Sequence, residues 1–118
     1  MPENETLFPE LVILDARRVY FGLGENFQIK IGTTSRPNGR RGGEMHFAEL
    51  CSARGGRSVE SYYHGKYAAE RIGKTEWFHL SDRLALDLIV MCTEQGRTAS
   101  AETVKMIVRT RLRQTAAA

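Results

Sequence analysis

Three side chains that can carry chemistry recur at helical spacing in the middle of the chain. Glu60, His64 and Tyr67 stand at positions i, i+4 and i+7, so a helix would place them on one face. A carboxylate and an imidazole one turn apart often form only a surface pair, worth about 0.2–0.5 kcal/mol. The same two groups could also belong to a reactive site, and the spacing alone favours neither reading.

A second group of candidates is a set of arginines in a segment rich in glycine and proline. Arg36, Arg40 and Arg41 lie between Thr33 and Gly43. The glycine pair that closes this segment limits any helix to one or two turns. A guanidinium binds a phosphate bidentately, so the segment is either a solvated loop or a phosphate-binding one.

The elements that must position these residues follow an α+β pattern. Val19–Phe21 favours a strand, and Phe27–Ile31 alternates apolar with polar residues. The intervening Gly22–Asn26 contains turn residues, which predicts a hairpin with Tyr20 on one strand and Lys30 on the other. Met45–Cys51 is expected to be a third strand. We therefore predict a small three-stranded antiparallel sheet followed by helices.

Three helices are predicted from apolar spacing and capping residues. The first runs from Val59 to Ile72 with Ser58 as its cap, and the second begins after Ser81 or Asp82 and ends at Gly96. The third runs from about Ala101 to Arg113 with Ser100 as its cap. Its core stripe is Val104, Ile107, Val108 and Leu112, and its basic face is Lys105, Arg109 and Arg113.

Several short motifs occur in an order that is known from one enzyme family. Val19-Tyr20-Phe21, Lys30-Ile31-Gly32, an arginine eight residues later, the Glu60/His64 helix and Thr75-Glu76-Trp77-Phe78 follow one another. This set resembles the GIY-YIG endonuclease superfamily, most closely its short phage-type branch with a Lys-Ile-Gly second motif and a Glu-Trp-Phe segment. The resemblance covers Arg18 to Leu80, about half of the chain.

The resemblance implies metal-dependent hydrolysis of phosphodiester bonds in DNA. Tyr20 would position or deprotonate the attacking water, and Lys30 would stand in for the second tyrosine, binding a phosphate oxygen or lowering the pKa of Tyr20. Arg40 would clamp the phosphate, a role that Arg36 or Arg41 could take over. Glu60 would hold Mg²⁺ or Mn²⁺, hard cations that prefer oxygen ligands, and His64 would match the histidine of the family's helix.

Two departures from the family pattern keep other functions open. Lys30 replaces a tyrosine, and the helix expected around Arg40 is cut short by Gly42-Gly43. A non-catalytic DNA-binding module or a protein-interaction module on the same fold is the alternative. A core position is the simpler reading of Trp77-Phe78, although the pair could also stack on bases.

Length and charge bound the remaining possibilities. The 118 residues allow one domain, placed at 17–118, behind an acidic leader at 1–16 that is expected to be flexible. The leader carries a net charge of −4 and the rest of the chain +7, which suits a polyanionic partner.

No apolar run is long enough for a membrane span and no signal peptide is visible, so we expect a cytoplasmic protein. In such a reducing compartment Cys51 and Cys92 are expected to be free, buried thiols. Any specificity for DNA sequence would come from a homodimer, a partner protein or the last two helices.

Overall fold

A computed structural model describes residues 17–34 and 47–117 of the chain. The acidic leader therefore lies outside the described residues. So do three predicted site residues, Arg36, Arg40 and Arg41, and the first two residues of the strand predicted at Met45–Cys51.

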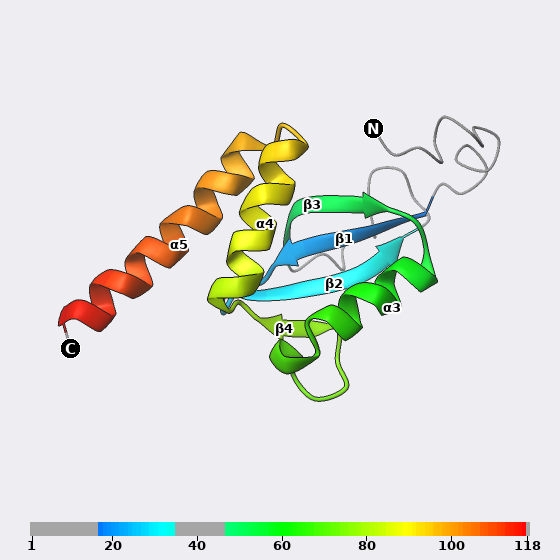
Figure 1. Cartoon of the computed structure of the whole chain (residues 1–118), viewed down its shortest axis with the longest axis horizontal. Coiled ribbons are helices and arrows are strands. Elements are labelled where there is room, and N and C mark those ends of the chain that lie inside the picture. Colours follow the sequence, from blue (N-terminus) through cyan, green and yellow to red (C-terminus); the bar gives the residue numbers. More distant parts are fainter. Residues whose placement is uncertain (1–16, 35–46, 118) are drawn as a thin grey trace.

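The described residues form an α+β fold around one antiparallel sheet (Figure 1). The strands are β1 (Arg18–Leu23), β2 (Gln28–Thr34), β3 (Ala48–Arg54) and β4 (Trp77–His79), in the spatial order β3-β1-β2-β4. β1 and β2 pair antiparallel with Phe21 opposite Ile31, which confirms the predicted hairpin. The strand predicted up to Cys51 continues to Arg54.

The fourth strand corrects the prediction of a three-stranded sheet. β4 pairs with β2 from Gln28↔His79 to Lys30↔Trp77, and Ile31 N–H donates to the Glu76 carbonyl at 2.9 Å just beyond it. A strand of three residues is too short to display an alternating pattern, so the sequence gives no periodic signal for it. Its consequence is that the Thr75–Phe78 segment lies along the edge of β2.

The two faces of the sheet have different chemistry. Val19, Phe21 and Ile31 are fully buried in one apolar cluster with residues of the helices, and Phe78 joins them as predicted. Directly opposed residues share a face, so Tyr20 lies beside Gly32, and Lys30 beside Trp77, on the other side. Trp77 is only partly buried and is not a core residue.

Helix α3 (Arg57–Lys66) is shorter than the predicted helix and is followed by a 3₁₀ turn at Ala68–Glu70. The break falls at Tyr67, whose ring is fully buried and whose hydroxyl donates a 2.6 Å hydrogen bond to Asp87. Ser58 is not the cap: the helix begins after Gly56, which makes no side-chain capping bond. Tertiary contacts at Tyr67 thus override the local helical pattern.

Helices α4 (Asp82–Glu94) and α5 (Thr98–Ala117) pack together beside the sheet, and the end of α5 extends away from it (Figure 1). Ser81 caps α4, accepting from Leu84 N–H at 3.1 Å, as predicted. α5 begins at Thr98, so the expected cap at Ser100 is wrong. Leu112, expected in the core, is 62% exposed.

Cys51 and Cys92 are free and buried, as expected, and the Cys92 thiol donates to the Leu50 carbonyl at 3.6 Å. Within the described parts of the chain, no helix combines the length and the apolar character that crossing a bilayer requires.

Candidate functional site

An aromatic layer lies on the face of the sheet opposite the helices. Tyr20 of β1 stacks on Phe47 with the ring centroids 5.2 Å apart and the planes 3° from parallel. Trp77 of β4 meets Phe47 edge-on at 6.5 Å. The Lys30 ammonium lies 5.5 Å from the Phe47 centroid and 5.8 Å from that of Trp77. Cation–π attraction to two rings therefore orients the charge of Lys30 on this face.

Glycines make room for this layer. A Cβ at Gly22 would lie 2.2 Å from Phe47 Cδ1, and one at Gly24 would lie 2.5 Å from Trp77 Cζ3. Gly22 was predicted to belong to the turn, but it is a residue of β1. Its role is steric: the missing side chain is replaced by an aromatic ring from another segment.

The edge of β2 beyond β4 gathers three oxygen-bearing side chains. A Cβ at Gly32 would lie 2.7 Å from the Tyr20 hydroxyl and 3.0 Å from Glu76 Oε1, so both atoms border the same small space. Glu60 reaches this edge from α3, where its Oε1 accepts from the Thr33 hydroxyl at 3.3 Å. The Glu76 carboxylate lies close enough to Glu60 to raise the pKa of that carboxyl group. Glu76 thus lies near Tyr20 at Gly32 and also near Glu60, which reaches β2 from the helix side.

Glu76 is the site residue that sequence reasoning missed. The segment Thr75–Phe78 belongs to the predicted motif set, but the sequence pattern indicates no role for its carboxylate. The only available signal was an acidic residue directly before a tryptophan in that motif. Its proximity to Glu60 depends on the pairing of β4 with β2, which the sequence pattern does not predict.

The pKa of Glu60 is raised above its usual value. Burial of the carboxyl group is the largest cause, and the negative charge of Glu76 is the next. His64 and the Thr33 hydroxyl act in the opposite direction but do not cancel these two effects. The site therefore favours either a proton or a cation between the two carboxylates.

His64 is fixed by the main chain of β2. Its Nε2 lies 2.9 Å from the Ile31 carbonyl oxygen and 3.5 Å from Glu60 Oε2. A carbonyl oxygen only accepts, so Nε2 carries the hydrogen and donates it. The ring also packs on Phe78 at 5.2 Å. His64 thereby connects α3 to β2 beside Glu60, whereas Tyr67 of the same predicted face turns to Asp87 instead.

The oxygen donors at this edge suit a hard divalent cation. Among residues 17–34 and 47–117, no group of three or more His, Cys, Asp or Glu side chains is arranged to hold a metal ion. Mg²⁺ retains several of its waters and commonly takes only one or two carboxylates together with substrate phosphate oxygens. Two adjacent carboxylates, one with a raised pKa, fit that mode of binding.

The structure places four of the predicted site residues around β2, and three lie outside the described residues. Tyr20 and Lys30 lie on the face opposite the helices, whereas Glu60 and His64 reach β2 from α3. Arg36, Arg40 and Arg41 lie outside the described residues, so their relation to the site stays a prediction. Comparisons of the chain with protein-family models, with curated proteins and with solved structures found no match.

Proposed function

We propose that this chain is a cytoplasmic, divalent-metal-dependent DNA endonuclease of the GIY-YIG type. The observation that carries the proposal is the approach of the Tyr20 hydroxyl and the Glu76 carboxylate to the same space at Gly32, with Glu76 near enough to Glu60 to raise its pKa. Hydrolysis of a phosphodiester needs an aligned water and neutralisation of the charge that develops on the phosphate. The Tyr20 hydroxyl, the Glu60 and Glu76 carboxylates and the Lys30 ammonium around β2 would provide these functions.

Each residue has a distinct part in this proposal. Glu60 and Glu76 hold Mg²⁺ or Mn²⁺, which would supply positive charge to a phosphate oxygen. The Tyr20 hydroxyl orients the attacking water, and Lys30 contributes positive charge on the same face. His64 keeps Glu60 in place through its bond to the Ile31 carbonyl, so it is a positioning residue. The arginines at 36, 40 and 41 are proposed to bind the phosphate.

The test is cleavage of single-stranded and double-stranded DNA by the purified full chain with Mg²⁺ or Mn²⁺. We expect Glu60→Gln to abolish cleavage while DNA binding persists, because the substitution removes one charge and keeps the shape. Glu94→Gln is the matched control, since Glu94 is exposed on α4 and outside the site. Full cleavage by the Glu60→Gln variant would refute the assigned metal role, and binding without any cleavage by the wild type would refute the nuclease.

A non-catalytic DNA-binding module is the second candidate, and one observation favours it. Tyr20 is only 2% exposed, which limits the access of its hydroxyl to a substrate. This candidate predicts DNA binding that weakens with salt and is unaffected by removal of divalent cations with a chelator. If the chain is a nuclease, the chelator should abolish DNA cleavage.

A further inference from the structure

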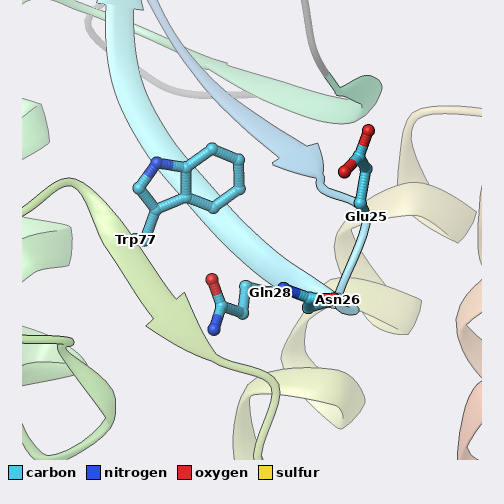
Figure 2. A pocket seen from close by; sticks show the side chains of 4 residues that line it. All are labelled: Glu25, Asn26, Gln28 and Trp77. Atoms are coloured by element: carbon cyan, nitrogen blue, oxygen red, sulfur yellow. The ribbon is translucent and has the colours of Figure 1, made fainter.

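A pocket opens at the tip of the β1–β2 hairpin, next to β4. It has a volume of about 310 Å³ and is lined by Glu25, Asn26, Gln28 and Trp77. Figure 2 shows the indole ring lying over β2, with Gln28 and the Glu25–Asn26 turn around the same opening. The volume lies at the lower end of the range for small-ligand pockets, roughly 300–1,000 Å³.

The indole is held in place by the hairpin. Gly24 leaves the space that Trp77 occupies, since a Cβ there would lie 2.5 Å from Cζ3. The turn is closed by hydrogen bonds from Gly24 N–H to the Gln28 carbonyl at 2.8 Å and from Phe27 N–H to the Gly24 carbonyl at 3.2 Å. A ring fixed in this way offers a preorganised stacking surface.

The hairpin tip also contains a strained and exposed aromatic residue. Phe27 has a φ of 57°, a left-handed conformation that is unfavourable for a bulky side chain, and it is 53% exposed. Neither feature benefits packing, because the side chain stays largely in solvent. Such strain is concentrated at binding sites, and Phe27 lies between the pocket residues Asn26 and Gln28.

The lining chemistry matches the faces and edges of a nucleobase. The indole can stack on a base, each amide can both donate and accept, and the Glu25 carboxylate accepts from an exocyclic amino group. That carboxylate repels phosphate, so the phosphate of a bound nucleotide must lie elsewhere. Lys30 provides its place, with an ammonium 5.8 Å from the same indole ring.

We propose that this pocket binds one unstacked nucleobase bearing an amino group, with its phosphate directed toward Lys30. The pocket would then hold a base of a single-stranded or distorted segment next to the phosphodiester at the Gly32 edge. The direction of the phosphate rests on the proposed function, whereas the pocket itself does not.

Trp77 is the only tryptophan of the chain, so its fluorescence reports on the pocket directly. The full chain is titrated without divalent metal using hexadeoxycytidylate, hexathymidylate and maltohexaose, while fluorescence anisotropy of labelled oligonucleotides reports binding independently. We expect quenching by hexadeoxycytidylate at a concentration about tenfold lower than by hexathymidylate, and none by the sugar. Quenching by maltohexaose would identify a carbohydrate pocket and overturn the proposal, and so would oligonucleotide binding without quenching.

Two variants make the test specific to the lining residues. Glu25→Gln is expected to remove most of the preference for cytosine, and Glu94→Gln, which removes the same charge from exposed α4, is expected to leave it intact. An unchanged preference in Glu25→Gln would refute the role of the carboxylate. Cleavage of DNA without quenching would support the proposed nuclease and contradict the nucleobase pocket. Quenching without cleavage would support the pocket and contradict the nuclease.

Discussion

The Glu76 carboxylate lies close enough to Glu60 at the edge of β2 to raise the pKa of Glu60, although Glu60 belongs to α3 and Glu76 directly precedes β4. The two are sixteen positions apart in the sequence, and the 3₁₀ turn after α3 together with the loop before β4 brings them together. Two carboxylates in contact oppose folding when both are ionised. This arrangement is therefore unfavourable for stability unless a proton or a cation lies between them.

Glu60→Gln is expected to raise the midpoint of thermal unfolding at neutral pH. The raised pKa means that ionisation of Glu60 costs more in the folded than in the unfolded chain. The contribution of Glu60 to wild-type stability should accordingly be most favourable below the usual glutamate pKa and be lost as pH rises through the raised value. The difference between variant and wild type should vanish in acid, as measured by calorimetry across this pH range.

A double-mutant cycle separates this effect from a general change of the surface. Glu76→Gln should also stabilise, because it removes the charge that opposes ionisation of Glu60, and the double variant should gain less than the sum of the single ones. Mg²⁺ or Mn²⁺ should raise the unfolding midpoint of the wild type and have little effect on the double variant. Strict additivity, or equal metal effects on both proteins, would show that the two carboxylates act independently.

Glu70 is expected to have the opposite pH dependence. Burial acts to raise its pKa, but hydrogen bonds from Arg83 at 2.9 Å and from Ser81 at 2.6 Å outweigh burial and lower it. Its contribution to stability is thus present above the usual glutamate pKa and is lost as pH falls through the lowered one. Glu70→Gln should cost about 1.5 kcal/mol near neutral pH and much less near pH 3, measured by urea denaturation. A cost that does not change with pH would contradict the assignment.

The basic face of α5 is expected to contact DNA, with Glu102 opposing the contact. Glu102 lies 3.1 Å from the Lys105 ammonium and 3.8 Å from the Arg109 guanidinium, and the helix carries no acidic residue after it. Glu102→Gln frees both cations, so DNA binding should tighten and its salt dependence should steepen by about one to two units. Fluorescence anisotropy of labelled DNA at several salt concentrations measures the affinity and its salt dependence, with Glu94→Gln as the control. Identical slopes for Glu102→Gln and wild type would exclude contact with this face.

Elements with a sustained period were predictable from the sequence. The β1–β2 hairpin and α4 follow from alternating and helical patterns with turn and cap residues at their ends, and both are confirmed. β4 was missed because three residues carry no period. α3 was predicted too long because its end is set by the burial of Tyr67 and its bond to Asp87, a contact twenty residues away.

Residue types and their order in the sequence identify candidate site residues, but they do not predict the contacts that these residues make. Tyr20, Lys30 and Glu60 were identified by type and order, and they do lie around β2. The bond of His64 to the Ile31 carbonyl and the contact of Glu60 with Glu76 arise only when α3 and β4 settle on the same edge. Such long-range contacts have no local signature in the sequence.

Gly32→Ala is expected to disrupt the site more than any exposed substitution. The new methyl group would lie 2.7 Å from the Tyr20 hydroxyl and 3.0 Å from Glu76 Oε1, and Tyr20 is too buried to move away freely. Overpacking of this kind costs about 1–3 kcal/mol, which calorimetry and urea denaturation would detect. Gly65→Ala is the matched control, because nothing lies within 4 Å of its added Cβ, and in α3 it should stabilise by about 0.5–1 kcal/mol. If Gly32→Ala is instead as stable as wild type, Tyr20 and Glu76 do not meet closely at Gly32, and the proposed site loses its geometric basis.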